Sequence, residues 1–280
     1  MGINEMTTNR IDQRFKQLRD AGRCGLIPFI TAGDPFPEAT VPLMHSLVAG
    51  GADLLELGVP FSDPMADGPV IQASSERAIE RGISLVKVLE AVADFRHVDQ
   101  DTPVILMGYM NPVERLGSAE LATTAQSSGV DALLLVDCPP EEAPGLQRDL
   151  SNRNIYQIYL VAPTTTQERC EKICGYARGF VYYVAVKGIT GTQQSAGAQT
   201  ADNIAVIRKF TDLPVAMGFG IKDARSAALA AREADAVVIG SALVEELVNC
   251  DSVDSACRTA EVFVARMRSA IDNKDKAIAR

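Results

Sequence analysis

The chain has 280 residues, of which 47% are hydrophobic and 22% charged, and this globular composition excludes disorder and collagen-like repeats. A formal net charge of −9 argues against nucleic acid and anionic membranes as partners, because an acidic surface repels both. The apolar runs are far shorter than the roughly 20 residues that a membrane-spanning helix needs.

The N-terminal segment and the cysteines indicate where the protein works. Residues 1–22 are polar and amphipathic and lack the apolar run of a signal peptide. The six cysteines form no C-x-x-C pair, which favours reduced thiols over disulfides or a zinc site. We therefore expect a cytoplasmic location.

In chain order, an amphipathic helix is expected first, over about residues 10–21. Short apolar runs rich in Val, Ile and Leu then recur, and each is followed by a loop and a helical pattern. Eight such runs occur, at 25–31, 53–58, 103–108, 131–137, 155–162, 180–186, 214–218 and 235–240. Helical patterns between them include 73–82, 84–95, 119–128, 166–176, 201–210 and 223–233. A long helix over about 252–271 follows the last run.

This alternation predicts the fold class. Continuous apolar runs of such length are typical of parallel strands buried on both faces. Eight strand–helix units within roughly 250 residues predict an α/β fold, a closed (β/α)8 TIM barrel with an extra N-terminal helix. We expect one domain over residues 1–280, with an ordered core of about 10–271 and polar termini. An open doubly wound sheet is the alternative, but no early G-x-G-x-x-G motif opens a helix.

Catalytic side chains of such barrels lie at the carboxyl ends of the strands, and Glu56 is the most informative candidate there. It lies between leucines in the second run, where an ionised carboxylate is costly to bury. A raised pKa would suit a general acid or base, but a glutamate satisfied by hydroxyl groups fits the position equally well. Asp63 and Asp67, in the Pro- and Gly-rich loop that follows, could supply a second carboxylate. Taken alone, Asp63 fits a turn or cap residue better.

Glycine-rich loops follow three neighbouring strands and indicate a phosphate site. They cover residues 188–191, 217–221 and 239–242. Glycines let backbone N–H groups approach an anion, and a helix N-terminus favours negative charge. Each loop alone is a weak signal, whereas three at adjacent strand ends form a stronger one.

The sequence lacks the residues that metal-dependent or imine-forming catalysis would need at the strand ends. The two histidines, His45 and His97, fall in helical segments, which disfavours zinc-dependent aldolases. Lys187 lies just past the sixth run, so imine chemistry is disfavoured without being ruled out. Carboxylate acid/base chemistry on a small phosphorylated molecule remains.

Taken together, these residues resemble the tryptophan synthase alpha chain family. The matching stretches are 28–35, 55–64, 66–69, 107–112, 180–183, 188–191, 218–220 and 240–241. The resemblance extends from about residue 10 to the last helix, and its most specific part runs from Glu56 to Asp67. It implies a lyase of tryptophan biosynthesis, which cleaves indole-3-glycerol phosphate reversibly to indole and glyceraldehyde 3-phosphate.

The resemblance also assigns residues. Glu56 would move protons, Asp67 would stay ionised beside the indole N–H, and Tyr182 would support Glu56 as a third catalytic residue. The residues that map to substrate binding are Phe29, Ile71, Met107 and Phe219 around the indole, Gly191, Gly220, Gly240 and Ser241 around the phosphate, and Thr190 near Asp67.

A partner is implied as well. The family pairs this chain with a beta chain that carries pyridoxal phosphate, in an α2β2 heterotetramer, and no cofactor is expected in this chain itself. The positions that map to the contact side are Pro60, Asp63, Asn111 and Pro139. Ala185 stands where many members have serine, and the arginine common after Thr190-Gly191 is absent, which leaves the details of loop closure open.

Two other functions remain as alternatives. Another barrel enzyme acting on a phosphorylated substrate would be favoured by a lysine or metal ligands at a strand end, which the sequence lacks. A non-enzymatic subunit that binds ligand and activates its partner would be favoured by loss of Glu56 or Asp67, and both are present.

Overall fold

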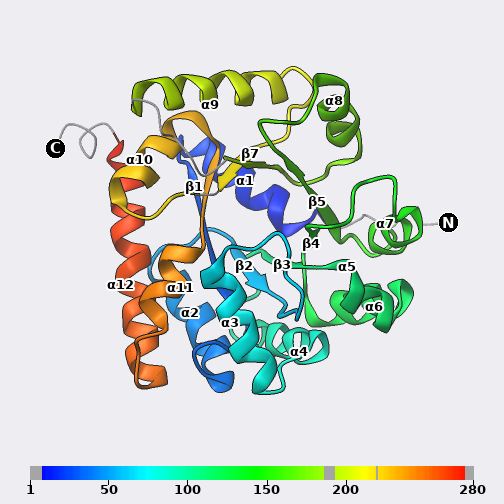
Figure 1. Ribbon diagram of the computed structural model, residues 1–280, viewed down its shortest axis with the longest axis vertical. Helices are drawn as coiled ribbons and strands as arrows, with labels where there is room; N and C mark the ends of the chain where they lie inside the picture. The colour runs from blue at the N-terminus through cyan, green and yellow to red at the C-terminus, as the bar shows by residue number, and fades with distance from the viewer. Residues whose placement is uncertain (1–7, 186–192, 219, 275–280) are drawn as a thin grey trace.

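Eight parallel strands form a closed barrel in which each strand pairs with its neighbours in chain order and the last pairs with the first (Figure 1). The strands are β1 (Gly25–Thr31), β2 (Leu55–Gly58), β3 (Val104–Gly108), β4 (Ala132–Leu135), β5 (Tyr156–Val161), β6 (Val181–Val184), β7 (Val215–Gly218) and β8 (Ala236–Ile239). The structure is a computed structural model and describes residues 8–185, 193–218 and 220–274. It confirms the predicted (β/α)8 TIM barrel.

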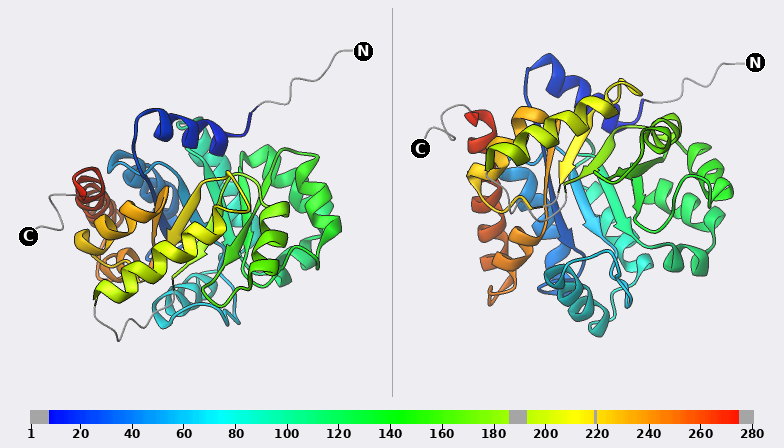
Figure 2. Two further views of the ribbon diagram at one scale, coloured as in Figure 1. Left: turned by 90° about the horizontal axis from the view of Figure 1, so that it is seen from above. Right: turned by 45° about the horizontal axis from the view of Figure 1, so that its top comes forward.

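Helices cover the outer side of the barrel and the N-terminal end of its strands (Figure 2). They are α1 (Arg10–Asp20), α2 (Thr40–Ala49), α3 (Pro69–Glu80), α4 (Leu85–Arg96), α5 (Met110–Leu116), α6 (Ser118–Ser128), α7 (Pro144–Ser151), α8 (Gln167–Tyr176), α9 (Gln193–Ile207), α10 (Ala224–Glu233), α11 (Ser241–Leu247) and α12 (Val253–Asp272). None of them, in the part of the chain described, combines the length and hydropathy that crossing a membrane requires.

The predicted helix over 201–210 is wrong at both ends. The observed α9 begins eight residues earlier, at Gln193, and ends at Ile207, followed by turns. The sequence of its first two turns, QQSAGAQT, lacks the apolar periodicity from which a helix is predicted.

The side chains of each strand contribute alternately to two apolar layers, one inside the barrel and one beneath the helices, because successive side chains of a strand point to opposite faces. On β1, Ile27 belongs to the cluster inside the barrel, whereas Leu26 and Ile30 belong to the cluster beneath the helices. All seven residues of β1 are buried. This two-sided burial explains why the strands read as continuous apolar runs.

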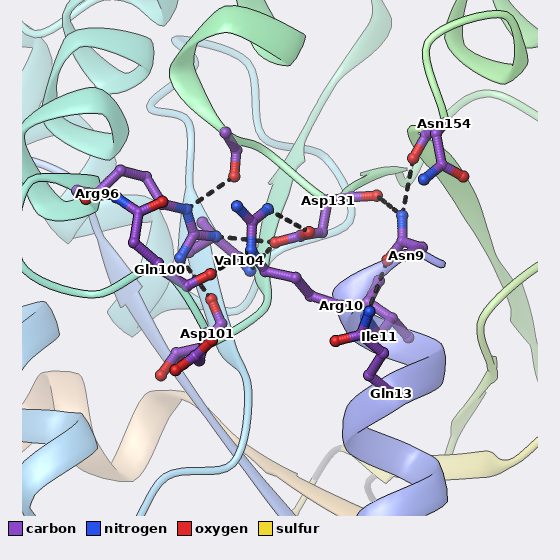
Figure 3. A network of polar contacts seen from close by, with 12 residues as sticks. Asn9, Arg10, Ile11, Gln13, Arg96, Gln100, Asp101, Val104, Asp131 and Asn154 are labelled. Carbon is purple, nitrogen blue, oxygen red and sulfur yellow. Dashed lines mark hydrogen bonds and ion pairs between the residues drawn. The ribbon is translucent and has the colours of Figure 1, made fainter. Parts of the chain in front are cut away.

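Helix α1 packs against the N-terminal ends of the strands. Its Phe15 ring contacts the Phe180 ring, with centroids 5.6 Å apart, and joins the cluster inside the barrel. A polar network holds the start of the helix (Figure 3): the Asn9 side chain accepts the Ile11 N–H, and its amide donates to the Asp131 and Asn154 carbonyls. The predicted extra helix therefore covers the bottom of the barrel.

Candidate active site

Glu56 points into the barrel from the middle of β2. In the sheet it is in register with Phe29 on one side and Ile105 on the other, and its side chain is 2% exposed. Burial, and secondarily the charge of Asp67, raises the pKa of Glu56 to about 8. A carboxyl group with this pKa is protonated at neutral pH and can give a proton to a bound molecule.

Tyr182 lies on β6 and contributes its side chain to the same barrel interior. Burial, with a further contribution from the charge of Glu56, raises its pKa well above the ordinary value. The phenol therefore stays protonated and can donate a hydrogen bond. Gly218 on β7 leaves the space for it, because a Cβ there would lie 2.2 Å from the Tyr182 hydroxyl oxygen.

Asp67 lies in the loop between β2 and α3, close enough for its charge to act on Glu56. Burial raises the pKa of Asp67, while a hydrogen bond from Tyr109 lowers it. Tyr109 donates to Asp67 Oδ2 over 3.0 Å, and the Gln72 amide on α3 donates to the Asp67 carbonyl over 2.8 Å. The two carboxyl groups thus share one site but have different surroundings.

Apolar side chains from four elements meet near Glu56. Phe29 of β1, Ile71 of α3 and Val244 of α11 form one buried cluster, against which Met107 of β3 packs. The structure therefore brings together three residues that the resemblance assigns to the indole pocket. Val244, which the sequence did not single out, is the third buried residue of this cluster.

Two of the glycine-rich loops lie at neighbouring strand ends. Gly240 caps the N-terminus of α11, whose first residue is Ser241, and no side chain hydrogen-bonds to this cap. Gly220, just past β7, has a φ of +78°, and a Cβ added there would meet no atom within 4 Å. A helix N-terminus without a side-chain cap and an open glycine loop can both accommodate an anion. Three further predicted residues, Thr190, Gly191 and Phe219, lie outside the described residues.

The positions assigned to partner contact differ in exposure. Asp63 and Asn111 are exposed and Pro139 is partly buried, but Pro60 is buried. The Asp63 carboxylate accepts a hydrogen bond from the adjacent Ser62 hydroxyl over 2.6 Å, as expected for a turn residue.

Sequence reasoning missed the role of Tyr109 and of Gln72. Tyr109 falls within the matching stretch 107–112, but nothing in the local pattern connects it with Asp67. The usable signal is its place at the carboxyl end of β3, the strand beside β2. Neither histidine lies at the carboxyl end of a strand: the His45 ring contacts the Phe95 ring, and His97 caps the C-terminus of α4.

Comparisons with known proteins lead to a single family. The family model described as tryptophan synthase alpha chain matches residues 15–272. A tryptophan synthase alpha chain of Laribacter hongkongensis is 52% identical over 264 residues, which cover 94% of this chain and 99% of that protein. One from Xanthomonas oryzae is 53% identical over 264 residues, covering 94% and 98%.

Solved structures give the same result. The tryptophan synthase subunit alpha of Legionella pneumophila superposes with a TM-score of 0.88 at 44% identity, covering 95% of this chain and all of that one. A chain of tryptophan synthase from Mycobacterium tuberculosis, in an aminoacrylate-bound form, superposes with a TM-score of 0.83 at 30% identity. It covers 94% of this chain and 100% of that one.

Proposed function

Because the chain belongs to the tryptophan synthase alpha chain family, we propose that Glu56 and Asp67 are the carboxylates that catalyse the family's reaction. That reaction is the reversible retro-aldol cleavage of indole-3-glycerol phosphate to indole and glyceraldehyde 3-phosphate. The protein is accordingly a carbon–carbon lyase of tryptophan biosynthesis.

The observation that carries the assignment of Glu56 is its burial beside a second carboxylate, with a pKa raised to about 8. In the cleavage direction, protonated Glu56 gives its proton to indole C3, and the substrate becomes an indolenine-like cation. The carboxylate then takes the proton of the neighbouring side-chain hydroxyl while the bond between C3 and the side chain breaks. Glu56 ends protonated as it began, and the hydroxyl carbon becomes the aldehyde.

Asp67 takes the complementary role. Burial is the largest cause of the raised pKa of both groups, but the Asp67 carboxylate also accepts a hydrogen bond from Tyr109, which opposes the effect of burial, whereas the second influence on Glu56, the charge of Asp67, raises its pKa further. Because the two carboxylates repel each other, one of them holds a proton at neutral pH. Glu56 is the group that holds it, and Asp67 stays ionised. An ionised Asp67 accepts the indole N–H and stabilises the positive charge that develops on the ring.

The remaining residues bind the substrate and support the acid. Phe29 and Ile71 of the buried cluster, and Met107 packed against it, are assigned to the indole, the resemblance adds Phe219, and Tyr182 supports Glu56. Gly220, Gly240 and Ser241 are assigned to the phosphate, which backbone groups would hold, and the resemblance adds Gly191 to this set and assigns Thr190 to the Asp67 side of the site. Such a site needs no basic patch, which suits a chain with a net charge of −9.

The family name implies a beta chain as partner. We propose an α2β2 assembly in the cytoplasm, with pyridoxal phosphate on the beta chain and no cofactor on this one. Asp63, exposed in the loop after β2, and Asn111, exposed in the first turn of α5 after β3, support contact on this side of the barrel. We further propose that residues 1–280 act as one domain.

The first test is release of glyceraldehyde 3-phosphate from indole-3-glycerol phosphate, with and without the beta chain. Glu56→Gln keeps the size of the side chain but cannot cycle a proton, so activity should fall by about 10²–10⁴-fold. Glu120→Gln, an exposed change on α6, is the matched control and should match the wild type. A folded wild-type protein that is inert even with its partner would favour the subunit that only binds ligand.

A further inference from the structure

The side chain of Tyr109 connects two successive residues, Ala66 and Asp67, of the loop between β2 and α3. The Ala66 N–H donates to the Tyr109 hydroxyl oxygen over 3.0 Å, and that hydroxyl donates to Asp67 Oδ2 over 3.0 Å. A phenol has a single proton, and because its oxygen already accepts the Ala66 N–H, this proton is directed at the carboxylate. The hydroxyl therefore has a fixed direction as well as a fixed place.

We propose that Tyr109 is a positioning residue of the known reaction, which holds the Asp67 carboxylate in one orientation and favours its ionised form. The inference rests on the proposed function of Asp67. It extends that function to a residue that touches neither the substrate nor the acid Glu56 in the mechanism given above.

The tyrosine is itself held firmly enough to do this. It is 4% exposed, and its ring contacts that of Phe61, with centroids 5.2 Å apart. The N–H of the next residue, Met110, donates to Asp137 Oδ1 over 2.8 Å, which ties this turn to the loop after β4. A catalytic group needs a support of this kind, because errors of about 1 Å in its position lower the rate strongly.

A second contact fixes the other end of Asp67. Gln72, one turn into α3, donates to the Asp67 carbonyl, so the backbone and the carboxylate of the same residue are held from different sides. Helix α3 is in turn fixed to the end of β1, because Arg77 donates twice to the Asp34 carboxylate, over 2.7 Å each. Asp67 is thus oriented in the chain as it stands, before any substrate binds.

The charges around the carboxylate decide the direction of the pH effect. Among the described residues, Asp67 faces the acid Glu56 of β2 and the phenol of Tyr109, and Asp137 acts on that phenol from the loop after β4. Burial and the charge of Asp67 raise the pKa of Tyr109, so it remains a donor at working pH. Removing the donor leaves burial to raise the pKa of Asp67 further.

The test compares the wild type with Tyr109→Phe, each assembled with the beta chain, across about pH 5 to 9. The phenylalanine keeps the ring contact with Phe61 and removes only the hydroxyl. Because the ionised form of Asp67 is the active one, the acid limb of the kcat profile should move to higher pH by about one unit. At the optimum, kcat should fall by about tenfold, while KM changes less.

Tyr156→Phe is the matched control. Its hydroxyl also donates to an aspartate, Asp12, but this pair links β5 to α1 at the opposite end of the barrel. The control should keep the wild-type pH profile. Replacing Tyr109 with 3-fluorotyrosine tests the same hydrogen bond without removing an atom, because a more acidic phenol is a stronger donor, and the acid limb should then move to lower pH.

Two results would overturn the inference, and they are distinguishable. If Asp67→Asn is inactive but neither change at Tyr109 moves the acid limb, the proposed function stands and Tyr109 has no positioning role. If Asp67→Asn retains wild-type activity, the proposed function of Asp67 fails, and the inference fails with it.

Discussion

At the residue scale, the site depends on two carboxyl groups of the same chemistry in different surroundings. Glu56 is enclosed in the barrel wall, and burial is the largest cause of its raised pKa. Asp67 lies on a loop, where Tyr109 donates a hydrogen bond to its charged form. Burial favours the neutral form of a carboxyl group and raises the pKa of both groups, but only Asp67 has a donor that favours its ionised form, and this difference is the basis of the proposed roles of the two groups.

The raised pKa of Glu56 predicts a cost in stability. Folded protein binds this proton more tightly than the unfolded chain does, so the free energy of unfolding should decrease as the pH rises from about 4.5 to about 8. Glu56→Gln removes this ionisation and should be more stable than the wild type at about pH 8.5, by about 1–3 kcal/mol. Urea unfolding of both proteins at several pH values measures the difference.

The same series contains its own check. Glu120→Gln, at an exposed position, should follow the wild type at every pH. If Glu56→Gln also loses stability in parallel with the wild type between these pH values, the Glu56 carboxyl is not the group that titrates.

At the element scale, the N-terminal helix is fixed to the barrel by a buried ion pair network (Figure 3). Asp131, which precedes β4, is 3% exposed and accepts from Arg96 of α4, from Arg10 of α1 and from the Val104 N–H of β3. One carboxylate thus joins two helices to two strands. The network lies at the N-terminal ends of the strands, whereas the proposed catalytic carboxyl groups lie on β2 and in the loop that follows its carboxyl end.

Asp131→Asn should therefore destabilise the protein without changing its chemistry. It removes the nearest counter-charge of the buried Arg96 guanidinium, at 2.9 Å, and leaves only the more distant Asp99 carboxylate, at 3.9 Å; breaking one side of a buried pair costs about 3–5 kcal/mol. The kcat of the folded fraction should stay at the wild-type value. Asp20→Asn is the control: it breaks an exposed pair with Lys16 and should cost less than about 1 kcal/mol. Thermal unfolding measures the stability of both variants, and kinetics at one temperature measures their kcat. If the two variants lose the same free energy of unfolding, the role of the network is contradicted.

At the scale of the whole molecule, the last helix closes the ring of helices. Figure 1 shows α12 along the side of the barrel, where it packs against α2 and α10. The approach to α2 depends on Gly50, since a Cβ there would lie 2.7 Å from the Glu261 carbonyl oxygen and 2.9 Å from the Val264 Cβ. Arg268 of α12 also pairs with the buried Asp53, which leads into β2.

Gly50→Ala should accordingly separate α12 from α2 and lower the free energy of unfolding by about 1–3 kcal/mol. Gly175→Ala is the matched control, because this glycine lies in α8 with no atom within 4 Å of an added Cβ. The control should stabilise the protein slightly, by up to about 1 kcal/mol, since alanine favours a helix. Denaturant unfolding of both variants would show opposite signs, and two changes of the same sign would contradict this account of the contact.

Much of this protein could be predicted from periodicity and residue type. The eight apolar runs determined the strands and their parallel order, and a glutamate among leucines marked Glu56, because burial on both faces leaves its trace in the local sequence. Only the tertiary structure decided which side chains meet. The contact of Tyr109 with Asp67 spans 42 residues, and that of Arg96 with Asp131 spans 35. Such contacts depend on strand register and loop conformation, which are properties of the packed chain and of no single segment.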